Sequence, residues 1–132
     1  LPISPVDQIV GVSKFFGTID ENERGRAAFE TARKDREKAG QYTAYLKAGE
    51  RQKANELLTQ WGNGDPAVGR KLLSQAQTFE KLMAGINKER RSVQALPEDA
   101  RDERLNRLDE RMQRTQAVYL RNRAALIDGA DE

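Results

Sequence analysis

Neither cysteine nor histidine occurs in this chain of 132 residues. The lack of cysteine excludes disulfide bonds, thiol catalysis and thiolate metal ligands. The lack of histidine removes the side chain that serves most often as a general base and as a transition-metal ligand. The remaining candidates for catalysis are clustered carboxylates such as Asp99, Asp102 and Glu103. Their position predicts instead that they form the acidic first turn of a helix, where negative charge complements the helix dipole. We therefore predict no enzyme activity, no metal site and no bound cofactor.

Large aliphatic and aromatic residues are scarce as well. Leu, Ile, Val and Phe together make up about a fifth of the chain, a share at which disorder becomes a concern. The 23 basic and 21 acidic residues nearly cancel, so charge repulsion does not oppose compaction. Because no run of about 18 apolar residues occurs, we predict no membrane-spanning segment. Long helices with a narrow buried seam agree best with this composition.

The chain has the length of one compact domain or of one piece of a larger protein. Its first residue is Leu1 and not Met, and we expect it to be a fragment of a longer polypeptide. Two parts are predicted within it. Residues 1–66 are expected to form a short helix, a long helix and a second short helix, and residues 67–132 a helical hairpin.

The first part carries start and stop signals for its helices. Ser4 followed by Pro5 predicts the start of a short helix that ends at Gly17. Asp20 and Glu23 have the spacing of a capping box, which predicts that the long helix begins there. The apolar positions of the short helix are Val6, Ile9, Val10 and Phe16.

The long helix is predicted to continue to Ala48, with Gly49 as its stop. Gly40 lies inside it, and the low helix propensity of glycine makes this the place where a bend is most expected. Positions three and four apart predict the buried face of the helix. This face consists of Phe29, Ala32, Arg36, Ala39, Thr43 and Leu46.

A second short helix follows and ends at the loop residues from Gly62 to Pro66. Trp61 together with Tyr42 and Tyr45 is compatible with a surface on which nucleic-acid bases stack. Because the charges around these aromatics are balanced, we expect Trp61 to pack against neighbouring helices instead. The buried face of this helix is predicted to be Ala54, Leu57, Leu58 and Trp61.

Two apolar stripes at helical spacing, separated by Pro97, predict the hairpin. Its first helix begins near Val68 and ends near Leu96, and Pro97 suits the first turn of the next helix, which stops at Gly129. The connection is too short for parallel packing, so we expect two antiparallel helices, each about 40 Å long. The stripes are Leu72, Ala76, Phe79, Met83, Ile86, Arg90 and Val93 in one helix and Leu105, Leu108, Met112, Thr115, Tyr119 and Leu126 in the other.

The predicted fold is therefore all-α, a helical bundle with a long C-terminal antiparallel helical hairpin. Stripes of this spacing build a bundle within one chain or an interface between chains, and both uses stay open, with the intrachain use favoured. The candidate helix-packing residues are Phe79, Met83, Ile86, Leu105, Leu108 and Met112.

The last predicted helix is rich in arginine and contains no lysine. Glu103 and Arg107 stand four residues apart in the order that stabilises a helix, as do Glu110 and Arg114. These pairs predict a solvated face that neutralises its own charge. The alternative is a basic flank that contacts phosphate groups or an acidic partner. The candidate contact residues are Arg104, Arg107, Arg111 and Arg114.

Short stretches that carry a family resemblance are spread over most of the chain. In the first part they are Leu1-Pro2-Ile3, Phe15-Phe16-Gly17, the helix from Phe29 to Leu46-Lys47-Ala48-Gly49, and Arg51, Ala54, Leu57 and Leu58. In the hairpin they are Ile86, Lys88, Arg90 and Arg91 before the proline turn and Arg101, Leu105, Leu108 and Arg111 after it. On these residues the chain resembles the carboxy-terminal helical region of large polyvalent proteins and internal virion proteins of bacteriophages. Their turn commonly reads Leu-Ser-Pro-Glu-Glu-Lys-Arg, where this chain has Leu96-Pro97-Glu98-Asp99-Ala100-Arg101.

This resemblance implies a structural and assembly module of an internal virion protein, or ejection protein. Such a protein is packaged inside the capsid and released into the host with the genome. The implied module acts by helix packing against the rest of its own polypeptide, other ejection proteins or the portal, and a homo-oligomer stays open. The resemblance carries over no catalytic residue. The alternative function, drawn from the residues, is a nucleic-acid-binding helical module that uses the arginine flank of the last helix.

Overall fold

The computed structural model describes residues 21–130. In this range it contains four helices and no strand: α3 (Glu21–Lys47), α4 (Arg51–Trp61), α5 (Pro66–Val93) and α6 (Glu98–Ala130). The prediction of an all-α fold with a C-terminal helical hairpin is confirmed. The short helix predicted to end at Gly17 lies outside the described residues.

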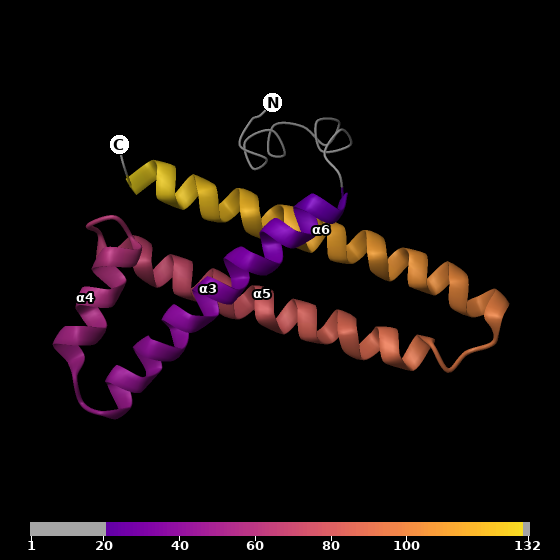
Figure 1. Ribbon diagram of the computed structural model, residues 1–132, viewed down its shortest axis with the longest axis horizontal. Coiled ribbons are helices and arrows are strands. Elements are labelled where there is room, and N and C mark those ends of the chain that lie inside the picture. The colour runs from indigo at the N-terminus through magenta and orange to yellow at the C-terminus, as the bar shows by residue number, and fades with distance from the viewer. Residues whose placement is uncertain (1–20, 131–132) are drawn as a thin grey trace.

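Helices α5 and α6 form the hairpin and run antiparallel along the longest dimension of the molecule (Figure 1). At the start of α5 the Asp65 carboxylate accepts a 2.9 Å hydrogen bond from the backbone N–H of Ala67, and Pro66 occupies the first turn. At the start of α6 the carbonyl of Pro97 accepts a 2.9 Å hydrogen bond from the N–H of Arg101, so Pro97 directly precedes the helix.

The predicted stop at Gly129 is wrong by one residue, because α6 continues through it to Ala130. A glycine ends a helix when it adopts a positive φ, and in the described chain the glycines with positive φ are Gly49 and Gly64. Gly49 does act as the predicted stop of α3. Its N–H bonds to the carbonyl of Leu46 at 3.0 Å, and the N–H of Glu50 bonds to that of Tyr45 at 2.8 Å, the Schellman arrangement.

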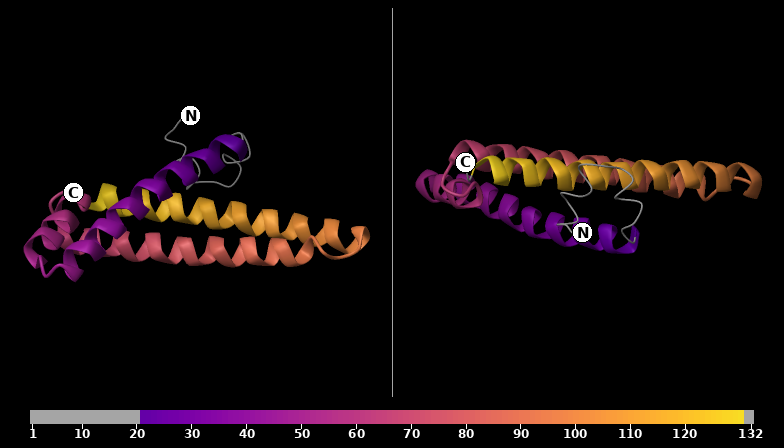
Figure 2. Two further views of the ribbon diagram at one scale, coloured as in Figure 1. Left: turned by 60° about the horizontal axis from the view of Figure 1, so that its bottom comes forward. Right: turned by 90° about the horizontal axis from the view of Figure 1, so that it is seen from above.

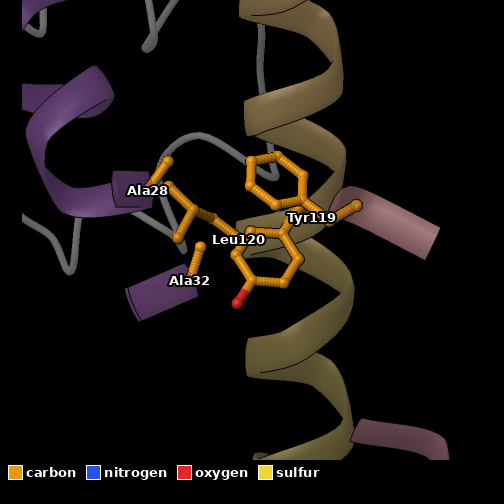
Figure 3. Close-up of a cluster of buried hydrophobic side chains, with 5 residues drawn as sticks. Ala28, Ala32, Tyr119 and Leu120 are labelled. Atoms are coloured by element: carbon orange, nitrogen blue, oxygen red, sulfur yellow. The ribbon is translucent and has the colours of Figure 1, made fainter. Parts of the chain in front are cut away.

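Helix α3 crosses one face of the layer formed by α5 and α6 (Figures 1 and 2). At the crossing it contacts this layer through the small side chains of Ala28 and Ala32, which pack with Phe79 of α5 and with Tyr119 and Leu120 of α6. Figure 3 shows the two alanines beside Leu120 and Tyr119. Small residues at the crossing allow the backbones of the two elements to approach closely.

The buried face predicted for α3 is largely wrong. Phe29 is 62% exposed and Leu46 is 45% exposed, and Arg36 and Thr43 are exposed as well. Of the predicted face only Ala32 is buried, whereas Ala39 is half-buried.

The observed buried face of α3 is turned by one residue, to Arg24, Ala28, Ala32 and Asp35. The prediction placed the large apolar side chains inside, but α3 packs through its small ones. It also buries the carboxylate of Asp35, whose partners lie on α6. The pattern of α3 alone cannot show that a charged residue has partners on another helix.

Helices α4 and α5 pack closely against each other at a corner of the chain, which lies at the end of the hairpin opposite the α5–α6 connection (Figure 1). Leu58 and Trp61 of α4 are buried with Leu72 and Ala76 of α5, as predicted for each helix. The expectation that Trp61 packs against helices is confirmed. This close approach requires a glycine at position 69, because a Cβ atom there would lie 2.0 Å from the carbonyl oxygen of Leu58.

Candidate interaction surfaces of the hairpin

A buried polar cluster joins α3 to α6. The Asp35 side chain is only 1% exposed, and its Oδ2 accepts a 2.5 Å hydrogen bond from the hydroxyl of Tyr119. The guanidinium of Arg123 donates to both carboxylate oxygens, at 2.9 and 3.0 Å. The carboxylate is thus bonded on both oxygens, which offsets the cost of burying its charge.

The electrostatics of this cluster hold Tyr119 protonated and Arg123 charged. Burial, the hydrogen bond to Asp35 and the negative charge of Asp35 raise the pKa of Tyr119 far above its usual range. Burial by itself would lower the pKa of Arg123, but its hydrogen bond and charge attraction to Asp35 outweigh burial and raise it. A tyrosine that keeps its proton and an arginine that keeps its charge make a structural tie and not an acid–base pair.

Sequence reasoning missed this cluster. Tyr119 was placed in the apolar seam, which is correct for its ring, since the ring stacks on Phe79 with 4.2 Å between centroids. The available signal was the spacing of Asp35 from Ala28 and Ala32, which places the acid on the same helix face as two small residues.

The candidate helix-packing residues line the interface of α5 with α6. Ile86 and Leu108 are buried together with Val93 in the distal half of the hairpin, and Phe79 is buried under α3. The remaining candidates are partly buried around this distal cluster: Met83, Leu105 and Met112. An ion pair of 2.7 Å between Arg90 and Asp109 ties the two helices beside it.

A groove lies between α5 and α6 on the face that α3 leaves uncovered. It has a volume of about 430 Å³, within the range of ligand pockets, and Leu82 and Val118 line it at 51% and 43% exposure. Glu80 of α5 pairs with Arg36 of α3, and Leu82 lies two residues further along the same helix. At 3.6 residues per turn, positions two apart project to nearly opposite sides, so the groove faces away from α3.

The four candidate arginines line a second hollow further along the same two helices. Its volume is about 670 Å³, and it also contains Glu89 and Glu110. The predicted pair of Glu103 with Arg107 is present at 2.6 Å, and Arg111 reaches across to Glu89 at 2.9 Å. The structure thus brings Arg104, Arg107, Arg111 and Arg114 together on one surface.

Two of these arginines are free of carboxylates. Within residues 21–130, neither Arg104 nor Arg114 makes an ion pair, so the predicted pair of Glu110 with Arg114 does not form there. Arg111 and Arg114 line both the apolar groove and the second hollow. Positive charge therefore lies directly beside exposed apolar side chains.

Asp99, Asp102 and Glu103 are exposed in the first turns of α6, where Asp102 pairs with Arg101 and Glu103 with Arg107. Across residues 21–130, no group of three or more acidic side chains is placed to hold a metal ion. None of the helices described here has the length and apolar character needed to cross a bilayer.

Fold and surface together define a class: a four-helix module whose hairpin offers an arginine-rimmed groove, as far as residues 21–130 are concerned. Comparisons with protein-family models, curated proteins and solved structures returned no match.

Proposed function

We propose that this chain is a non-enzymatic structural module that works by helix-mediated contacts with other proteins. One observation carries the proposal. The hairpin buries one of its faces under α3, while the other face exposes Leu82 and Val118 beside a groove. Large apolar side chains exposed over a groove are typical of surfaces on which a partner packs.

The more specific proposal is that the module belongs to a bacteriophage internal virion protein, or ejection protein. Its support is the resemblance of the segments around Phe29 to Gly49 and Ile86 to Arg111. In this role the module is packaged in the capsid interior and released into the host with the genome. Its partners are then other ejection proteins, the portal or the rest of its own polypeptide.

Mass spectrometry of purified virions, grown from the genome that encodes this chain, tests the virion role. Peptides of the chain are expected in full particles and are expected to be lost from particles that have ejected their DNA. Major capsid protein peptides, retained in both kinds of particle, serve as the control. Absence of the chain from full particles, or a short free-standing cellular gene as its source, contradicts the virion role.

The second candidate function is nucleic-acid binding, and it is favoured by the gathering of four arginines in one hollow. Of these four, Arg104 and Arg114 are the ones without an ion pair to residues 21–130 and so are available for phosphate, since Arg107 and Arg111 already pair with carboxylates. Double-stranded DNA binding that depends on these two residues would weaken as salt is raised, because phosphate contacts release counterions.

Salt titration of duplex binding separates this candidate from the first. A plot of log affinity against log salt has a negative slope. Arg104→Gln and Arg114→Gln are each expected to make this slope shallower by about 0.9, the value for one phosphate contact. Arg121→Gln is the matched control, because Arg121 is exposed on α6 outside the hollow. Binding that is undetectable at low salt rejects the nucleic-acid function.

A further inference from the structure

The groove on the face that α3 leaves uncovered lies between two long helices, as helix-binding grooves do. Its walls come from the antiparallel helices α5 and α6, so it follows the direction of two long helices. A third helix packs on two others by placing its side-chain ridge between them. An amphipathic helix supplies such a ridge with residues three and four apart, and Leu82 and Val118 would contact them.

The positive charge at the groove determines which flanking residues a bound helix should carry. Arg111 and Arg114 line it, and Arg114 makes no ion pair in the described part of the chain. A helix with acidic residues beside its apolar stripe would pair with Arg114, whereas a helix with basic residues there would be repelled.

Helix α3 already demonstrates this arrangement on the opposite face. It packs on α5 and α6 through Ala28 and Ala32, and its Asp35 pairs with Arg123 of α6. One helix face thus supplies both the apolar contact and a carboxylate for an α6 arginine. A helix on the uncovered face would likewise need apolar side chains for the groove and a carboxylate for an α6 arginine, here Arg114.

A second copy of the chain is a poorer occupant. Among residues 21–130, the exposed phenylalanine that could enter the groove from another copy is Phe29 on the outer side of α3. On that helix Arg26 lies three residues from Phe29, and so on the same side, whereas Arg33 is already paired with Glu30 and Glu37. Arg26 would be brought towards Arg111 and Arg114, which is unfavourable.

Single-stranded nucleic acid is disfavoured by the groove floor. Base stacking needs exposed aromatic faces. The aromatic rings at the groove belong to Phe79 and Tyr119, which are stacked on each other and are 7% and 5% exposed. The exposed apolar atoms are those of aliphatic side chains, which suit a protein helix better than a base.

We infer that the groove between α5 and α6 binds an amphipathic helix from a partner protein, one whose apolar stripe is flanked by acidic residues. This inference rests on the proposed function of helix-mediated contact and names the chemistry of the partner. Leu82 and Val118 contact the apolar stripe, and Arg114 pairs with a flanking carboxylate. Gln75 also lines the groove, and its buried Oε1 has no hydrogen-bond partner in residues 21–130.

A pair of designed peptides tests the inference on the full chain of 132 residues. Each peptide is about 18 residues long, carries leucines three and four apart, and is stabilised as a helix in the same way. One peptide has glutamate on both flanks of the leucines, and the other has lysine at the same positions. Fluorescence anisotropy measures the affinity of each at low and physiological salt.

The acidic peptide is expected to bind at least about tenfold more tightly than the basic one, and less so at high salt. Leu82→Ser is expected to weaken it about tenfold and Arg114→Gln about fivefold. The matched controls are Leu46→Ser, at an exposed leucine of α3, and Arg121→Gln, at an exposed arginine outside the groove. Both controls are expected to leave the affinity unchanged.

Equal binding of the two peptides, or binding that is indifferent to Leu82→Ser and Arg114→Gln, overturns the inference. It is overturned too if a single-stranded oligonucleotide displaces the peptide at stoichiometric amounts, or if the peptide binds only after the chain dimerises. Circular dichroism shows whether each variant is folded. The virion test is independent: a chain absent from virions that still binds the acidic peptide refutes the phage role and leaves the groove assignment intact.

Discussion

The hydroxyl of Tyr119 donates a 2.5 Å hydrogen bond to Oδ2 of Asp35, a residue 84 positions earlier in the chain. Arg123, one turn after Tyr119 on α6, donates to the same carboxylate. This contact sets where α3 crosses the hairpin, because a buried carboxylate with two specific partners tolerates little sliding. Among residues 21–130, the crossing leaves the other face of α5 and α6 open.

Asp35→Asn is expected to lower the free energy of unfolding by about 2–3 kcal/mol, since it leaves the charge of Arg123 without its counter-ion. The loss lies below that of a fully buried pair because the Arg123 side chain is 22% exposed and water reaches it. Urea unfolding followed by circular dichroism measures the change.

Asp109→Asn is the matched control for this prediction. Asp109 also pairs with an arginine, Arg90, at 2.7 Å, but its side chain is 50% exposed. Its loss is expected to cost less than about 1 kcal/mol. Equal effects of the two substitutions would show that the Asp35 cluster is not a structural tie.

Alkaline pH is expected to destabilise the fold through Tyr119. The folded state raises the pKa of this hydroxyl, so its contribution to stability is complete below pH of about 10, the ordinary value for tyrosine. Above that pH the unfolded chain loses the proton and the folded chain retains it, so the contribution falls by about 1.4 kcal/mol per pH unit. Tyr119→Phe removes this component.

Stability curves of the native chain and of Tyr119→Phe between neutral and alkaline pH check this prediction. Their difference isolates Tyr119 from the other groups that titrate in this range. The native chain is expected to be the more stable near neutral pH, by about 1–2 kcal/mol for the lost hydrogen bond, and to lose that advantage as pH rises. Parallel curves contradict the prediction.

Two glycines of α5 are expected to respond in opposite directions to alanine. A Cβ atom at Gly69 would lie 2.0 Å from the carbonyl oxygen of Leu58, so Gly69→Ala must push α4 away and cost about 3 kcal/mol or more. Nothing lies within 4 Å of a Cβ at Gly85, and Gly85→Ala is expected to stabilise the helix by about 0.5–1 kcal/mol. Thermal unfolding of both variants measures the difference, and destabilisation of similar size by both would refute the close corner.

Ile86 and Leu82 provide a test of which face of α5 is buried. Ile86 is 1% exposed and Leu82 is 51% exposed. Ile86→Ala is therefore expected to cost about 2–5 kcal/mol of unfolding free energy, whereas Leu82→Ala is expected to change it by less than about 0.5 kcal/mol. Chemical unfolding checks both values. A large loss at Leu82 would mean that the groove is already covered by the chain itself.

The hairpin was the part of the fold best predicted from sequence. Leu72, Ala76, Phe79, Ile86 and Val93 recur at helical spacing and are all buried. Such a stripe is readable because both hairpin helices bury large apolar residues against each other, so hydropathy and burial coincide. The short connection around Pro97 then left antiparallel packing as the outcome.

The candidate sites were predicted only in part. The row from Arg104 to Arg114 is visible in the sequence, and the structure places it on one surface. The groove beside it was not predicted, because Leu82 and Val118 fall outside either stripe and nothing in a single helix marks where two such residues meet. The Asp35 cluster was missed for the same reason, since its members come from two helices.

The amino-acid order alone determined that this chain forms long helices, where most of them begin and end, and that two of them pair, because caps and apolar spacing act within a few turns. Only the tertiary structure decided which face of α3 is buried, that Asp35 meets Tyr119 and Arg123, and which face of the hairpin α3 leaves uncovered. These outcomes depend on how small residues let one helix cross two others, and the energies involved arise between segments far apart in the chain.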